Sequence, residues 1–156
     1  MKLPASTEWL LHSAATLAQL EPGATVSAAQ LAEYYDVPAA YLAKQLQSLV
    51  RAGMLAATTG PRGGFRLARP ADDITLLDVV EALDGAGSPY ECREIRQQGA
   101  GAVPPEDCRN RCVLAVKMDE AHQAWRDSLA GATLADIVAT LPATAPTRAR
   151  SILGRD

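Results

Sequence analysis

The sequence predicts a mainly α-helical protein built on a winged helix-turn-helix, with a long C-terminal helix beyond it. Three observations carry this prediction. Three helix-forming segments come first, and two short strand-forming segments around a glycine-rich turn follow them. A longer helix-forming stretch then begins after a loop rich in Gly and Pro. These segments divide the chain into a winged domain over 1–84, a loop over 85–107, a long helical region over 108–142 and a flexible tail over 143–156.

The first helix is predicted over residues 6–20, and its two faces differ in polarity. At helical spacing, one side gathers Leu10, Leu11, Ala14, Leu17 and Ala18, and the other gathers Glu8, His12 and Gln19. Glu8 and His12 are four residues apart, so they project from one face of the helix. Trp9 falls beside this polar set.

The next two helices have clear start and stop signals. Ser27 is a suitable N-cap for a helix over 28–35. After a turn, Pro38 can occupy the first position of a helix that Gly53 closes. The stripe Leu42, Leu46, Leu49 and Val50 is predicted to be buried, and Tyr41, Lys44, Gln45, Ser48 and Arg51 are predicted to lie on the outer face.

A β-hairpin and further helices complete the prediction. Strands are expected over 54–59 and 65–69, around the tip "GPRGG", and Thr75 can cap a helix that ends at Gly85. A loop as long as 85–107 is usually functional or disordered. A long helix is expected from about Pro105 to Gly131, and a short one follows until Pro142 stops it.

The distribution of charge favours binding to double-stranded DNA. The chain has a net charge of −3, yet residues 38–70 contain Lys44, Arg51, Arg62, Arg66 and Arg69 and no Asp or Glu. A recognition helix needs donors on its outer face and cations that meet phosphates. Tyr41, Lys44, Gln45, Ser48 and Arg51 fit that need, and Arg62 at the wing tip can enter a minor groove or contact the backbone.

Three cysteines, Cys92, Cys108 and Cys112, lie close together in the sequence. On one helix Cys108 and Cys112 would face the same way, with Cβ atoms about 5 to 6 Å apart, which is too far for a disulfide but suits a metal chelate. The other reading is that both are small buried apolar residues.

The composition and the lack of a long apolar run at the N-terminus indicate a cytoplasmic protein without a membrane span.

The run "YLAKQLQSLVRAGMLAATTGPRGGFRLARP" followed by "ITLLDVVEALDG" resembles the Rrf2 (BadM-like) family of winged-helix transcriptional regulators, which includes IscR and NsrR. The resemblance extends from the first helix to "TLADIV". It implies a homodimer that pairs along the long helix, so that 108–142 is the dimerisation and cluster-binding region. It also implies near-palindromic operators and, in many members, a signal sensed through an iron–sulfur cluster.

A [2Fe-2S] cluster needs two protein ligands on each iron, so Cys108 and Cys112 leave two positions open. Cys92 is one candidate, but its spacing departs from the compact three-cysteine run of the family. In the family the first helix can give a carboxylate ligand to a cluster held by the other subunit, and Glu8 matches that position. Glu8 and His12 on one iron, with a cysteine pair on the other, is most similar to the redox-sensitive RsrR branch.

In this interpretation Trp9 lies beside the cluster, and His122 is a surface or interface residue. The mixed ligand set is expected to raise the reduction potential, as His ligands do in Rieske centres, which favours a reversible redox switch. The alternative for Glu8 and His12 is an ordinary surface pair.

Alternative functions are a zinc or thiol sensor, a nitric-oxide or iron-status sensor, and a cofactor-free interaction protein. The sequence has no phosphate-binding Gly loop, nucleophile elbow or HExxH helix, so we expect no enzyme and no small-molecule substrate.

Overall fold

A computed structural model describes residues 2–154 of the chain, which form two compact units. The first, called the winged unit here, comprises residues 2–85 and the described residues from 129 onward. The second, the loop–helix unit, comprises Ala86–Ser128. This division differs from the predicted one, because the segments after 129 belong with the N-terminal domain. Residue 1 of the predicted winged domain and residues 155–156 of the predicted tail lie outside the described range.

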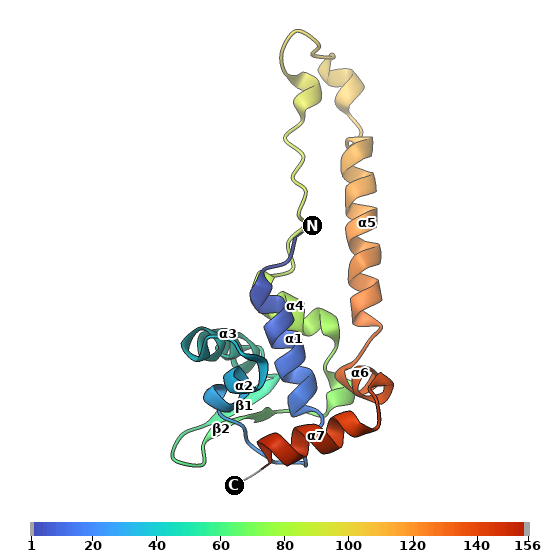
Figure 1. The fold of residues 1–156 in the computed structure, drawn as a ribbon. Helices are drawn as coiled ribbons and strands as arrows, with labels where there is room; N and C mark the ends of the chain where they lie inside the picture. The colour runs from blue at the N-terminus through green and yellow to red at the C-terminus, as the bar shows by residue number, and fades with distance from the viewer. Residues whose placement is uncertain (1, 155–156) are drawn as a thin grey trace. The chain divides into compact units, whose positions relative to one another are not determined.

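The winged unit confirms the predicted fold (Figure 1). Its helices α1 (Ala5–Leu17), α2 (Ala28–Tyr35) and α3 (Ala39–Arg51) precede an antiparallel hairpin of β1 (Leu55–Thr58) and β2 (Gly64–Leu67), and α4 (Leu76–Asp84) follows. The helices α2 and α3 form the helix-turn-helix, and the hairpin is the wing.

Local capping interactions explain why several helix boundaries could be predicted from the sequence. The Ser27 hydroxyl accepts a hydrogen bond from the Gln30 N–H at 3.1 Å, and the Gln30 side chain accepts one from the Ser27 N–H at 2.9 Å. This reciprocal pair satisfies two N–H groups that a helix start leaves without partners. Thr75 and Asp78 form the same arrangement at the start of α4. Gly53 follows α3 with a φ of 72°, which L side chains rarely adopt.

Helix α1 runs through the middle of the winged unit, in contact with α3, α4, α6 (Leu134–Thr140) and β2. Leu10, Ala14 and Leu17 are buried in the core, as expected. Burial also extends to polar residues of α1, namely Ser6, Thr7, Ser13 and Thr16. The exposed polar face of α1 is therefore narrower than the sequence predicted. Gln19, which was predicted on this face, lies beyond the end of α1 and is buried.

Helices α4 and α6 are joined at their first turns. The Leu76 N–H donates to the Ala132 carbonyl at 2.9 Å, and the Leu134 N–H donates to the Ile74 carbonyl at 2.8 Å. Thr75 and Thr133 face each other in this short antiparallel bridge, and each caps its own helix with an Asp three residues on. The pairing holds the returning chain against the winged fold.

The expectation of a flexible tail over 143–156 is wrong for the described residues. Thr144–Leu153 form helix α7, whose Ala149 and Leu153 are buried, and Leu153 belongs to the main core. Pro146 does not prevent this helix. It lies in the first turn of α7, where a helix tolerates the missing N–H.

The loop–helix unit contains two short 3₁₀ turns, η2 (Ile95–Gln97) and η3 (Pro105–Cys108), and the helix α5 (Val113–Ala130). The expected helix start near Pro105 is wrong, because residues 109–112 are not helical. The Asn110 carbonyl accepts a hydrogen bond from the Arg96 guanidinium at 3.1 Å, and α5 begins with the bond from the Val116 N–H to the Cys112 carbonyl. Within residues 2–154, no helix is both long and apolar enough to cross a membrane.

The wing is anchored at its base by a close backbone approach at Gly64. Val26, before α2, pairs with Phe65 of β2 through two backbone hydrogen bonds of 3.0 and 2.8 Å. A Cβ added at Gly64 would lie 2.5 Å from the Val26 carbonyl, far inside van der Waals contact. Only glycine allows the strand to lie this close to the chain before α2.

Gly64→Ala is therefore expected to lower the free energy of unfolding by about 1–3 kcal/mol, because the strand must move away from Val26. Gly87→Ala is the matched control, since Gly87 has open space around its Cα and no positive φ. Urea denaturation of both variants measures the difference. Equal midpoints for the two variants would contradict the close-approach explanation.

Candidate functional site

The predicted recognition helix presents most of its predicted DNA-binding residues to solvent. Tyr41, Lys44 and Arg51 of α3 are exposed, and Gln45 is partly exposed. Ser48 differs, because it is 9% exposed and its hydroxyl accepts a hydrogen bond from the Arg51 guanidinium at 3.2 Å. Ser48 therefore supports Arg51 and does not lie on the exposed face.

The wing tip carries Arg62 in a fixed position. Its carbonyl accepts a hydrogen bond from the Thr25 hydroxyl at 3.1 Å, which connects the tip to the loop between α1 and α2. Its guanidinium is exposed. The exposed residues of α3 and the wing tip thus belong to one compact unit, as a helix-turn-helix reader with a wing requires.

Glu8 and His12 lie on the narrow exposed strip of α1. Both are exposed, whereas their neighbours on the helix are buried or partly buried, apart from Ala5 at its start. Residues four apart on a helix have Cβ atoms about 5 to 6 Å apart. The predicted pair is thus available to a ligand or to a partner subunit.

Aromatic contacts link this strip to the helix-turn-helix. The Trp9 and Tyr41 rings meet edge to face, with centroids 5.5 Å apart. The His12 ring lies 5.7 Å from that of Tyr35, whose hydroxyl donates to the His12 carbonyl at 3.2 Å and is 2.5 Å from the Thr16 hydroxyl. Tyr35 ends α2 and Tyr41 lies in the first turn of α3. The two contacts therefore flank the turn between the two helices.

The structure places the cysteines differently from the prediction. Cys108 ends η3 and Cys112 immediately precedes α5, so they do not share a helix face. Cys92, which the spacing disfavoured, lines one hollow together with Cys112. All three thiols are free; Cys92 is exposed, and Cys108 and Cys112 are partly exposed.

The surroundings of Cys112 favour the thiolate that metals bind. The pKa of its thiol is lowered, and the largest cause is the backbone N–H of Ala115. Burial opposes this, and the Leu114 N–H, Cys92 and Arg96 add smaller lowering effects. The start of a helix stabilises negative charge in this way. Arg96 is held by Glu94, at 2.5 and 2.7 Å, and its positive charge acts on both Cys108 and Cys112.

Each unit offers candidate metal ligands of its own. The loop–helix unit brings two sulfur atoms together beside a cation, and α1 exposes one carboxylate and one imidazole. Among the described residues, no group of three or more His, Cys, Asp or Glu side chains is close enough to hold a metal ion. The predicted ligand set paired Cys112 with Cys108, whereas the structure places Cys92 and Cys112 along one hollow.

Two residues of the candidate site were not predicted from the sequence. Tyr35 approaches His12 only through the tertiary packing of α2 on α1, which no local pattern reveals. Arg96 had a weak signal, because it follows Cys92 by four residues in the basic stretch "CREIR". His122, which is predicted to be a surface or interface residue, stacks on Trp125 with ring centroids 5.7 Å apart.

Comparisons with known proteins agree with this architecture. A family model described as "Rrf2: Iron-dependent Transcriptional regulator" matches residues 3–140. The chain is 32% identical over 126 residues to YwgB of Bacillus subtilis, which carries the name of an HTH-type transcriptional regulator, covering 80% of this chain and 76% of that protein. It is 31% identical over 137 residues to the similarly named YffB of Lactococcus lactis, covering 88% and 86%.

Solved structures share the fold. CymR of B. subtilis, described as its global cysteine regulator, superposes with a TM-score of 0.69 at 22% identity, covering 91% of this chain and 99% of CymR. IscR from T. potens superposes with a TM-score of 0.67 at 21% identity, covering 91% and 93%. At these identities the likeness establishes the fold.

The lowered pKa of Cys112 predicts its reactivity in the metal-free protein. Because the thiolate is the reactive form, alkylation of Cys112 by iodoacetamide should reach its half-maximal rate at a lower pH in the folded chain than in the urea-unfolded chain. Peptide mass spectrometry after timed alkylation measures this. A midpoint at the same pH or above it in the folded chain would show that Ala115 and Arg96 do not stabilise the thiolate.

Proposed function

The chain belongs to the Rrf2 family of transcriptional regulators, and within this family we propose that it is a homodimer that senses redox state through a [2Fe-2S] cluster, as in the RsrR branch. The exposed strip of α1 carries the proposal. Glu8 and His12 can act as ligands there, while Trp9 and His12 contact the two sides of the helix-turn-helix turn. A ligand-binding event on this strip acts directly on the residues that set the position of α3.

The family description supports iron as the metal, and the donor atoms support a mixed ligand set. We assign Glu8 and His12 to one iron. Cys112 is assigned to the other, with Cys92 as its partner because both line one hollow and Cys108 does not. Cys108 is the partner that the sequence favoured. When bound, the cluster supplies reversible transfer of one electron. Arg96 offsets the negative charge of the thiolates, and His12 is a neutral ligand that limits the charge of the site.

The homodimer is supported by the surface of α5. Only Ala115 of its eighteen residues is buried, and the exposed side chains include Leu114 at 69% and Met118 at 43%. Leu114, Met118, Ala121 and Trp125 recur at spacings of four, three and four residues, the pattern of paired helices. A second copy of α5 is the partner that this stripe fits.

A zinc or thiol sensor is the second candidate, favoured by the hollow that Cys92 and Cys112 both line. Iron and acid-labile sulfide analysis separates the two functions, because a zinc or thiol protein contains neither and has no visible absorbance.

Anaerobically purified protein is expected to contain about two iron and two sulfide ions per chain and to absorb visible light. Cys112→Ala, Glu8→Ala and His12→Ala should each lose most of the iron, because each removes one ligand. His122→Ala is the matched control and should keep it. Iron retained in His12→Ala would remove α1 from the ligand set.

The same measurement decides the second sulfur ligand. Cys92→Ala is expected to lose the cluster and Cys108→Ala to retain it. The reverse result would assign the position to Cys108, as the sequence predicted.

Oxidised and dithionite-reduced protein are expected to differ at least tenfold in affinity for one operator duplex, a difference of about 1.4 kcal/mol. Trp9→Phe should keep the iron but reduce this ratio, because the smaller ring weakens the contact with Tyr41. Gel shifts under anaerobic conditions measure both proteins. Equal affinities of the two redox states in the wild type would rule out the switch.

A further inference from the structure

A groove of about 970 Å³ lies on the winged unit beside the wing. Three separate parts of the chain line it: the wing tip with Arg62, the segment from the end of α1 to the first turn of α2, and the end of α7 with Arg150. Two guanidinium groups from distant parts of the sequence therefore face one hollow. The recognition helix α3 contributes none of its lining.

We propose that this groove is a track for the DNA phosphate backbone, and that Arg150 of α7 makes a phosphate contact outside the helix-turn-helix and the wing. The proposal rests on the DNA-binding function of the family and adds α7 to the DNA-binding surface.

The first support is the position of the groove. In helix-turn-helix complexes the first helix of the motif crosses the DNA backbone. The start of that helix, α2, lines the groove at Ser27 and Gln30, next to Arg62.

The second support is charge. Helix α7 has two arginines, Arg148 and Arg150, and no Asp or Glu between Thr144 and Leu153. Among the described residues that line the groove, Glu21 is the one carboxylate, so together with Arg62 and Arg150 these residues carry a net positive charge. A polyanion fits this surface better than a neutral or cationic partner does.

The third support is that Arg150 is weakly held. Its Nη1 lies 3.5 Å from the Glu21 carboxylate and 3.5 Å from the Gln19 carbonyl oxygen, both near the outer limit for such contacts. Exposed ion pairs of this kind contribute little to stability. Arg150 can therefore leave Glu21 and bind a phosphate at a small cost in free energy. In the absence of DNA, the Glu21 carboxylate occupies the place that a phosphate would take.

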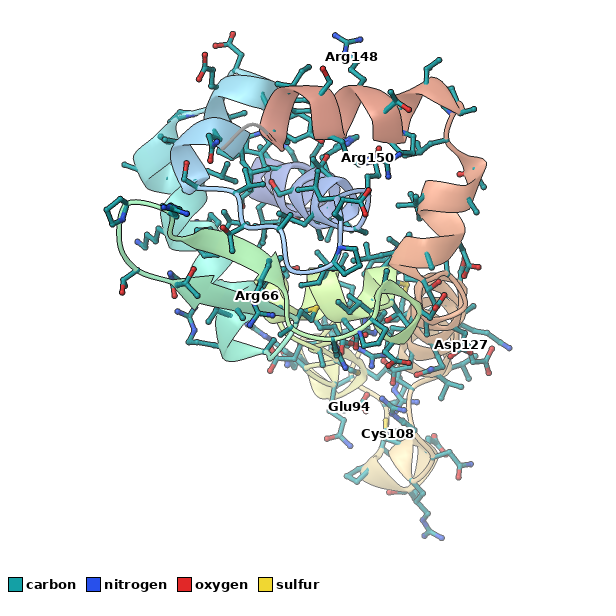
Figure 2. All side chains as sticks on the ribbon, turned by 90° about the horizontal axis from the view of Figure 1, so that it is seen from below. Arg66, Glu94, Cys108, Asp127, Arg148 and Arg150 are labelled. Carbon is teal, nitrogen blue, oxygen red and sulfur yellow. The ribbon has the colours of Figure 1, made fainter. Side chains whose placement is uncertain are left out.

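Arg148 supplies a control on the same helix. Residues two apart on a helix point in nearly opposite directions, and Figure 2 shows Arg148 and Arg150 on opposite sides of α7. Arg148 is exposed and does not line the groove. Substituting it changes the net charge as much as substituting Arg150 does, without touching the proposed contact.

The test compares Arg150→Gln, Arg148→Gln and Glu21→Gln in the full chain. The probe is a labelled duplex selected by the wild-type protein from a random pool, and binding is measured by fluorescence anisotropy over a series of KCl concentrations. Loss of one phosphate contact makes the slope of log K against log[salt] shallower by about 0.9. We expect that change for Arg150→Gln, an unchanged slope for Arg148→Gln, and tighter binding for Glu21→Gln.

The opposite signs for Arg150→Gln and Glu21→Gln separate DNA contact from a structural role. If the ion pair served only to hold α7, both substitutions would lower the thermal unfolding temperature and neither would tighten binding. An unchanged slope for Arg150→Gln, or equal changes for Arg150→Gln and Arg148→Gln, overturns the inference while the DNA-binding function stands. A wild-type protein that selects no duplex overturns both.

Discussion

The packing of α1 on nearly all sides is the constraint on which the rest of the winged unit depends. The helix contacts α3, α4, α6 and β2, so the recognition helix, the wing and the returning chain are all positioned against it. Such a helix has few surface positions left, and two of them are Glu8 and His12. Whatever binds this strip acts on a helix that cannot move without disturbing its neighbours, since packed interiors deform little. That property makes α1 a suitable place to detect a signal meant for α3.

The bridge between α4 and α6 connects the two parts of the winged unit, one before residues 86–128 and one after them. The segments "TLLDVV" and "TLADIV" each begin with a capping Thr followed by an Asp, and their first turns exchange backbone hydrogen bonds. The bridge joins Ile74–Leu76, which precede residues 86–128, to Ala132–Leu134, which follow them, so the winged unit is closed by backbone hydrogen bonds outside that segment. The same bridge brings α7 back, where Leu153 completes the core.

Local chemistry made most of the winged fold predictable. The Ser27 and Thr75 caps and the glycines at 53 and 85 mark boundaries through hydrogen bonds and backbone angles that the sequence itself encodes. The errors arose where tertiary contacts decide the structure. Arg96 binds the Asn110 carbonyl and delays the start of α5, and burial of Ala149 and Leu153 orders α7. Cys92 reaches Cys112 across an irregular loop, so the spacing between cysteines, read as helical, favoured Cys108 instead.

The assignment of candidate ligands to two units has a thermodynamic consequence for the proposed sensor. Residues on α1 meet the helix-turn-helix, whereas the cysteines meet the start of α5, the helix proposed to join two subunits. In the proposed sensor, a cluster with ligands from α1 of one subunit and cysteines of its partner would couple subunit pairing to the position of α3. Such coupling is reciprocal, so DNA must change the reduction free energy by the amount that reduction changes DNA affinity. For one electron, a tenfold preference between redox states corresponds to about 59 mV. This free energy is small, so the path from α1 to α3 must be short. The Trp9–Tyr41 contact reaches α3 through one pair of rings, and the His12–Tyr35 contact reaches α2 through another.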